Sequence, residues 1–451
     1  MPQIDPVKFP SDQFPPKTPI DKASDMRLES GGEITPWSRW TYHMGPPVLL
    51  LQCDADNRVT RLHSAAGVMQ EWYDPLDALR WMETFRREPQ QPGPPFKGGW
   101  VGYLSYDFGR LFETIPTTAK NDLHLPLFQF TYHDQLWALD RETNQNFRIS
   151  TPRWDPLNAM LLRESVIENA PGRLTSTFRR SEYELAVKRA IEYIAAGDIF
   201  QVNLSQRFSA PIREPAHHVY LKLQKKNPGW FGAYLGYGNH AIVSNSPELF
   251  LRITPDDNGA RTIVTRPIKG TRPRKDGMDS ALLVSAKDAA ELNMIIDLER
   301  NDLGRVCEVG SVRVTEPRSI EAHPTVYHGV ATVEGMLRDN VDLVELLRAT
   351  FPGGSITGAP KIRAMQIIEE LEPVRRGPYC GAIGFVSVDG HMEFNIAIRT
   401  MVFSHGLVHI SVGGGIVADS SPSDEYDETL VKAQAMCEAV GIDPDDLKML
   451  R

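Results

Sequence analysis

The first third of the chain is built from short apolar runs separated by turn-forming residues. Residues 48–51 (Val-Leu-Leu-Leu), for example, precede the turn at residues 54–57, and similar runs recur to about residue 150. This spacing is typical of antiparallel strands. Residues 75–87 differ because their apolar positions recur at three-residue steps, which predicts one helix.

A helical pattern opens the second part of the chain. Ser181 and Glu184 are spaced like a capping box, the apolar positions from Tyr183 to Ile194 form one stripe, and Gly197 stands where a C-terminal cap glycine is expected. Residues 200–208 then alternate. The apolar positions Phe200, Val202, Leu204 and Phe208 predict a core face, and the polar positions Gln201, Asn203, Ser205 and Arg207 an exposed or cavity-lining face.

Further elements follow as far as residue 440. Strands are predicted over 241–253, with an interruption at Ser246-Pro247-Glu248, and over 261–267, 381–388, 394–403 and 407–412, the last ending in three glycines. Helices are predicted over 280–303, where Glu291 lies among apolar residues, from Pro360 to Leu371 with Ile362, Met365, Ile368 and Leu371 as its buried stripe, and over 423–440. Glu425 and Glu428, three apart, share one face of that last helix.

Composition narrows the class of protein. A chain of 451 residues exceeds one ordinary core, and we divide it into a proline-rich lead-in (1–23), an amino-terminal region (24–165) and a second region (178–440). The net charge of −9 argues against a nucleic-acid binder. No apolar run is long enough to span a membrane, and four cysteines without CxxC spacing are typical of reduced thiols, so a cytoplasmic protein is expected.

Candidate chemistry centres on Lys269, which lies between Pro267 and Gly270. Proline restricts the backbone before the lysine, and glycine permits a sharp turn after it. A solvated basic turn is the simpler interpretation, because Arg266, Arg272 and other cations are near in sequence. The loop at residues 351–361 lacks the Gly-Lys-Ser/Thr of a phosphate-binding P-loop, which favours a loop that feeds a helix.

Eight segments, taken together, resemble the chorismate-utilising enzymes. They occur in family order and with family spacing over about residues 180–438: IFQVNLSQRF, SNSPELF, RPIKGT, SAKDAAELNMIIDLERNDLGRV, FPGGSITGAPK, FNIAIRT, GGGIVADS and EYDETLVKA. The resemblance implies an α+β fold with two antiparallel sheets packed as a sandwich and helices outside.

Within that family, the residue at position 269 selects the reaction. Members that place lysine there aminate chorismate to 4-amino-4-deoxychorismate, on the route to p-aminobenzoate and folate. Anthranilate synthase large subunits are similar but carry alanine, and isochorismate synthases place a lysine where this chain has Gln201. Amination is therefore implied; anthranilate synthesis and a catalytically silent paralogue of the fold are the alternatives.

The resemblance also assigns roles to individual residues. Lys269 matches the nucleophile that attacks C2, Glu248 the general acid for the C4 hydroxyl, and His328 a polar partner nearby. Glu291 and Glu428 match Mg²⁺ ligands, with Glu425 beside them. Arg266 and the other cations near Lys269 are expected to lower its pKa together with burial. The expected substrate contacts are Arg399, Tyr379, Gly270, Thr271, Thr357, Gly413, Gly414, Gly415 and Lys432.

Two partners are implied besides chorismate. The chain has no Gly-x-Cys-x-Gly nucleophile motif, so a separate glutamine amidotransferase subunit is expected to supply ammonia. A pocket for tryptophan, formed by Ser30, Pro228 and Tyr234, matches the region where relatives hold that amino acid. The sequence at 227–230, Asn-Pro-Gly-Trp, departs from the family pattern, so Trp230 itself is an alternative occupant.

Overall fold

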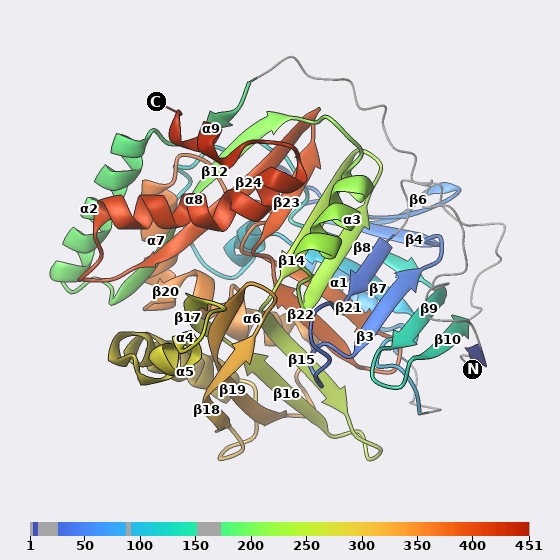
Figure 1. Ribbon diagram of the computed structural model, residues 1–451. Helices are drawn as coiled ribbons and strands as arrows, with labels where there is room; N and C mark the ends of the chain where they lie inside the picture. The colour runs from blue at the N-terminus through green and yellow to red at the C-terminus, as the bar shows by residue number, and fades with distance from the viewer. Residues whose placement is uncertain (1–2, 8–25, 87–91, 151–172, 451) are drawn as a thin grey trace.

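Two large antiparallel sheets form the molecule (Figure 1). The structure is a computed structural model that describes residues 3–7, 26–86, 92–150 and 173–450. Each sheet has 12 strands, and every pairing between named strands is antiparallel. Tyr42 of the first sheet packs against Phe385 of the second at 5.8 Å between ring centroids, so the sheets lie face to face. The predicted α+β sandwich is confirmed.

The first sheet collects strands from both ends of the chain. Its order is β1 (Gln3–Val7), β10 (Gln145–Ser150), β9 (Gln135–Asp140), β3 (Trp40–Met44), β2 (Met26–Glu29), β13 (Phe231–Gly236), β14 (His240–Ser246), β23 (Thr400–Ser404), β24 (Leu407–Ile416), β12 (Gln201–Pro211) and β11 (Thr175–Ser176), with β20 (Gly358–Ala359) paired to β12.

The second sheet also combines strands from both parts of the chain. Its order is β17 (Ile268–Pro273), β19 (Val326–Leu337), β16 (Arg261–Arg266), β15 (Leu249–Pro255), β22 (Met392–Ile396), β21 (Ala382–Ser387), β7 (Gly99–Leu104), β8 (Phe128–His133), β4 (Leu49–Cys53), β5 (Thr60–Ser64) and β6 (Gly67–Trp72), with β18 (Arg313–Ala322) paired to β19. The strands from before and after residue 150 therefore share both sheets.

Helices lie on the outside of this pair of sheets. They are α1 (Pro75–Glu83), α2 (Arg180–Ala195), α3 (Ala216–Lys226), α4 (Met278–Val284), α5 (Ala286–Gly304), α6 (Leu343–Thr350), α7 (Lys361–Leu371), α8 (Pro422–Ala439) and α9 (Pro444–Lys448). Helix α8 packs on β24, with α2 against α8, and α5 packs on β17 and β19 (Figure 1). None of the described helices is long and apolar enough to cross a membrane.

Several local predictions need correction. The expected capping box at Ser181 and Glu184 is wrong: α2 begins at Arg180, and Glu182 accepts from the Arg179 N–H. The expected helix over 280–303 is two helices, because the Ser285 hydroxyl accepts from the Asp288 N–H and starts α5 there. Phe200 lies before β12 and is 71% exposed, so it is not a core residue.

Two further corrections concern positions along elements. In α7 the predicted burial of Met365 and Ile368 is confirmed, but Ile362 is exposed and Leu371 only half-buried, and Ala364 and Ile367 are buried as well. The strand expected over 394–403 is two strands, β22 and β23, one in each sheet. The three glycines at 413–415 lie inside β24, paired with β12, and not at a strand end.

Candidate active site

Glu248 lies where the chain crosses from one sheet to the other. Strand β14 ends at Ser246 in the first sheet, and β15 begins at Leu249 in the second. The Glu248 carbonyl accepts from the Ile396 N–H at 3.0 Å, and its N–H donates to the Ser246 hydroxyl at 3.2 Å. The carboxyl is thereby fixed in the interior between the sheets, with only 4% of the residue exposed.

Burial makes this carboxyl a weak acid. It raises the pKa of Glu248 to about 7, although the nearby Ser355 hydroxyl, Lys269 amine and Ile268 N–H oppose the shift. A carboxyl with this pKa is substantially protonated at neutral pH. It can therefore donate a proton to a leaving group in the site.

Lys269 is aimed at the same space by an irregularity in β17. The pairing of β17 with β19 shifts register between Ile268 and Thr271, and Gly270 takes a φ of +83°. A Cβ at Gly270 would lie 2.7 Å from Leu282 and 3.0 Å from Asp288, so both the conformation and the packing require glycine. The Lys269 Nζ donates to the Ser355 carbonyl at 3.5 Å.

Burial and Lys432 favour the neutral amine of Lys269. Burial is the largest effect and lowers the pKa of Lys269, the Lys432 ammonium acts in the same direction, and Glu291, Glu248 and Glu428 oppose it. The expected contribution of Arg266 is not found. Its guanidinium pairs with Glu321 and lies over the Trp37 ring at 4.2 Å, so its charge is used elsewhere.

Two glutamates from different helices, Glu291 and Glu428, act on the charge of Lys269, and Glu425 lies beside Glu428. Glu291 comes from α5, and Glu425 and Glu428 come from α8. Burial raises the pKa of Glu428, but the charges of Lys432, at 2.7 Å, and of Lys269 and Lys287 together outweigh it and lower that pKa. Burial and the neighbouring Glu428 raise the pKa of Glu425, which accepts from the Ser420 hydroxyl at 2.7 Å. Among the described residues, Glu291 has no cation within 4.0 Å.

These carboxylates suit a hard cation that is shared with a substrate. Within the described part of the chain, no three His, Cys, Asp or Glu side chains are grouped closely enough to hold a metal alone. Mg²⁺ in proteins is bound by one or two carboxylates and completes its shell with substrate oxygens and waters. Glu291 and Glu428 would supply the two carboxylates that this mode of binding needs, with Glu425 beside Glu428.

Glycines of β24 form the floor beneath these groups. A Cβ at Gly414 would lie 3.1 Å from Glu425 Oε2 and 3.8 Å from Glu428 Oε1. A Cβ at Gly415 would lie 3.4 Å from Lys269 Nζ and 3.1 Å from Gln201 Nε2. Glycine at these positions keeps the space open beside Lys269. The carbonyl of Gly413 accepts from Lys432 at 2.8 Å, which ties α8 to this strand.

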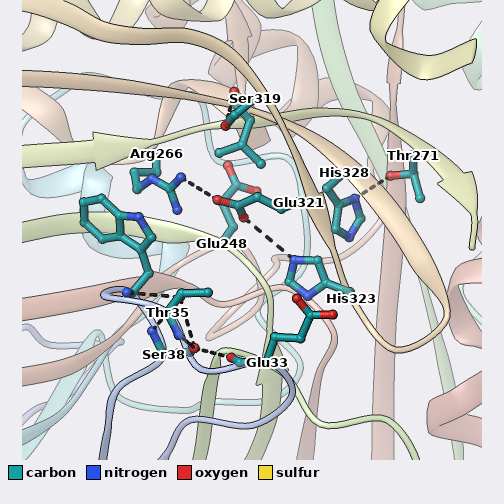
Figure 2. A network of polar contacts seen from close by, with 12 residues as sticks. Glu33, Thr35, Ser38, Glu248, Arg266, Thr271, Ser319, Glu321, His323 and His328 are labelled. Carbon is teal, nitrogen blue, oxygen red and sulfur yellow. Dashed lines mark hydrogen bonds and ion pairs between the residues drawn. The ribbon is translucent and has the colours of Figure 1, made fainter. Parts of the chain in front are cut away.

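His328 and Thr271 lie on neighbouring strands and contact each other. His328 Nδ1 is 2.9 Å from the Thr271 hydroxyl, and the His323 ring packs edge-on against His328 at 4.9 Å (Figure 2). Burial, His323 and Arg399 together hold the pKa of His328 well below its usual value. His328 is therefore a neutral hydrogen-bonding group.

The residues expected to contact a substrate anion differ in whether their donors are already used within the protein. Arg399, with a φ of +51°, has no carboxylate within 4.0 Å in the described chain, and burial lowers its pKa, so its guanidinium is available to an anion. Tyr379 is buried close to Arg399, and burial holds its pKa well above the usual value, so it is a neutral hydrogen-bonding group. Thr357 is fully buried, and its hydroxyl donates to the Gly353 carbonyl, so that proton is already used.

The residues expected around tryptophan are only partly together. Ser30 lines a cavity between the sheets with Trp40, Tyr42 and Trp230. Pro228 packs against Gly31 beside it, whereas Tyr234 packs at a tilt against Tyr220 in the neighbouring core. The Trp230 indole borders the cavity and packs at a tilt against the His323 ring, with 4.6 Å between ring centroids.

Two side chains at the site were not among the expected contacts. Gln201 is fully buried beside Lys269, and neither its amide nitrogen nor its amide oxygen has a hydrogen-bond partner in the described structure. Ser355 lies between Lys269 and Glu248. The polar face of residues 201–207 indicated Gln201, but no sequence pattern singles out Ser355.

Most of the chain matches one known family of enzymes. The model for chorismate binding enzymes matches residues 49–438. The chain therefore belongs to the chorismate-binding enzyme family.

Curated relatives narrow the comparison to two kinds of enzyme. Aminodeoxychorismate synthase component 1 of Salmonella typhimurium is 40% identical over 419 residues, covering 90% of this chain and 91% of that protein. Anthranilate synthase component 1 of Thermus thermophilus is 41% identical over 396 residues, covering 83% and 84%. The crystal structure of anthranilate synthase component I from Streptococcus pneumoniae superposes with a TM-score of 0.77 at 29% identity, covering 95% and 97%.

Proposed function

We propose that this chain aminates chorismate at C4 to give 4-amino-4-deoxychorismate. The observation that carries the proposal is the placement of Lys269: its amine shares an enclosed site with the protonatable carboxyl of Glu248. A lysine whose pKa is lowered by burial is suited to nucleophilic attack. Aminodeoxychorismate synthases among the relatives support the same reaction.

Lys269 and Glu248 divide the chemistry into two allylic displacements. In the first, the neutral amine of Lys269 bonds to C2 of the ring while Glu248 gives its proton to the departing C4 hydroxyl, which leaves as water. In the second, ammonia bonds to C4, the double bonds shift back, and the C2–nitrogen bond breaks to return the lysine amine. Two easier displacements thus take the place of one difficult direct substitution at C4.

Three glutamates and one arginine would fix the substrate. Glu291 and Glu428, with Glu425 beside them, would hold Mg²⁺, which supplies positive charge to bind the ring carboxylate of chorismate. Arg399 would bind a carboxylate, since its donors lie in the site without an acidic partner among the described residues. Tyr379, His328, Thr271 and the amides of Gly413, Gly414 and Gly415 would add neutral contacts, and Lys432 would face the metal side.

Ammonia is proposed to come from a separate glutamine amidotransferase subunit. The relatives are named as component 1 of their enzymes, which supports a two-component assembly. The cavity at Ser30 has a volume of only about 30 Å³, enough for about one water, so Trp230 on its border is proposed to take the place of a free tryptophan in this region.

Anthranilate synthesis is the second candidate, because an anthranilate synthase is as similar in sequence as the aminodeoxychorismate synthases. Lys269 distinguishes the two. In an anthranilate synthase a bulky amine beside the C2 position would obstruct ammonia, whereas in the proposed reaction it is the nucleophile.

Product analysis tests the proposal. The pure chain, with chorismate, Mg²⁺ and ammonium, is expected to yield 4-amino-4-deoxychorismate by mass spectrometry; anthranilate with pyruvate would establish the alternative. Lys269→Ala is expected to lose amination, and intact-protein mass spectrometry should show a chorismate-derived adduct only when Lys269 is present. Lys222→Ala, at an exposed lysine on α3, is the matched control. Unchanged turnover in Lys269→Ala would contradict the nucleophile assignment.

A further inference from the structure

A second cavity lies on β12, away from the candidate active site. It has a volume of about 310 Å³ and lies between β11, β12, the start of β24 and residues 122–123. Strands β12 and β24 run side by side here (Figure 1). Arg207 in its wall is about 20 Å along β12 from Gln201, at roughly 3.3 Å per residue. We call this space the Arg207 cavity.

The cavity has a buried cation with unused donors. Only 7% of the Arg207 side chain is exposed. Its Nη2 pairs with Asp122 Oδ2, but its Nε and Nη1 have no hydrogen-bond partner among the described residues. Donors in this situation are rare in folded proteins because removing them from water is costly. They point to a group that binds there.

Asp122 and His409 also have atoms that could form further hydrogen bonds. Asp122 Oδ1 has no hydrogen-bond partner in the described chain. His409 Nδ1 is 2.8 Å from the Ser209 hydroxyl, whereas His409 Nε2 has no partner among the described residues. Burial, followed by the Arg207 charge, lowers the pKa of His409 to about 3, so the ring is neutral at physiological pH.

These groups favour a ligand that carries both charges. Arg207 and Asp122 together have no net charge, and His409 adds none. A simple anion on Arg207 would be repelled by Asp122, and a simple cation on Asp122 would be repelled by Arg207. A molecule with a carboxylate and an ammonium a few ångströms apart satisfies both.

We propose that the Arg207 cavity binds a free α-amino acid, with its carboxylate on Arg207 and its ammonium on Asp122. Hydroxyls from residues 175–177 and Ser209 line the remaining wall and suit a small or polar side chain. The volume is at the lower end of the range for ligand sites, about 300–1,000 Å³. The cavity is separate from the one at Ser30, and the proposal does not depend on the reaction at Lys269.

Calorimetric titration of the full chain tests this binding without any substrate of the reaction. Glycine, L-serine, L-glutamine and L-glutamate are the probes, and sodium acetate and methylammonium chloride carry one charge each. At least one amino acid is expected to bind saturably, and neither single-charge probe is expected to do so. No saturable binding by any of the four, or equal binding of acetate, overturns the proposal.

Variants locate the site. Arg207→Gln and Asp122→Asn are each expected to weaken the binding by at least about tenfold. Leu407→Trp is designed to fill the cavity while leaving Arg207 and Asp122 unchanged. It should also abolish binding, and it tests the site if thermal unfolding shows that the Arg207 and Asp122 variants do not fold. Arg213→Gln, at an exposed arginine just after the same strand, is the control and should bind normally. Unchanged affinity in Arg207→Gln and Leu407→Trp would place the ligand elsewhere and refute the assignment.

Discussion

Glu248→Gln should make the protein more stable at alkaline pH while removing its activity. The carboxyl has a pKa of about 7 in the folded chain, against a usual value of 4.5. Each pKa unit corresponds to roughly 1.4 kcal/mol, so keeping this carboxyl in the interior costs about 3 kcal/mol once the unfolded chain is fully ionised. Glutamine has nearly the same shape and carries no proton to lose.

The sign of the effect depends on pH. Below pH 4.5, both folded and unfolded carboxyls are protonated, and the substitution should change nothing. Between pH 4.5 and about 7 only the unfolded chain ionises, so the advantage of glutamine should grow, and above about 7 it should level off. For a chain of 451 residues, about 3 kcal/mol corresponds to a rise of roughly 3 °C in the unfolding midpoint.

Thermal unfolding of both proteins from pH 4 to 9 measures this difference. Glu308→Gln, at an exposed glutamate, is the matched control and should show no pH-dependent gain. If the gain of Glu248→Gln is the same at low and high pH, or is absent at pH 8, the buried carboxyl does not carry the cost assigned to it, and its role as a protonated acid at neutral pH fails as well.

Three other predictions follow from the site. The same Glu248→Gln variant should lower kcat by about 10²–10⁴-fold. In the unmodified enzyme, kcat/KM should fall as the pH rises above about 7, because the Glu248 carboxyl must be protonated to act as the acid. A flat profile of kcat/KM from pH 6 to 9 would exclude Glu248 as the acid. Arg399→Gln should raise KM for chorismate by about 10–100-fold in steady-state assays without lowering stability, since the described chain offers it no acidic partner; an unchanged KM would remove it from the substrate site. Gly270→Ala should destabilise by at least about 2 kcal/mol in denaturant unfolding, and Gly259→Ala, which has a similar φ of +87° but open space around it, should cost less; equal losses would show that packing at Gly270 is unimportant.

Local features of this fold could be predicted because they depend on neighbours in sequence. The strand interruption at Ser246-Pro247-Glu248 and the cap at Gly197 were both evident, and Gly197 has a φ of +82°. What the sequence did not reveal is that the strands on either side of Glu248 belong to different sheets. Pairing of that kind is decided by distant partners, so no local pattern encodes it.

Competition between equivalent local signals explains the other differences. Apolar periodicity continues through Ser285, yet its hydroxyl starts a new helix. Glu182 and Glu184 both follow the helix start, and only Glu182 reaches the Arg179 N–H. At the site, Arg266 is near Lys269 in sequence, but Glu321 from β18 takes its charge. Lys432, which acts on the Lys269 pKa, is contributed by a helix more than a third of the chain away.

The sharing of both sheets between the two halves of the chain bears on how the protein is made. Leu104 of β7 pairs with Ala382 of β21, and Tyr234 of β13 pairs with Arg27 of β2. During synthesis, β7 can pair early with β8, but its other edge must wait for β21 until most of the chain has left the ribosome, and contacts of such long range form slowly. The amino-terminal strands thus emerge with open edges and need protection from aggregation until the later strands arrive. In the folded protein these edges are paired, so this need is no longer visible.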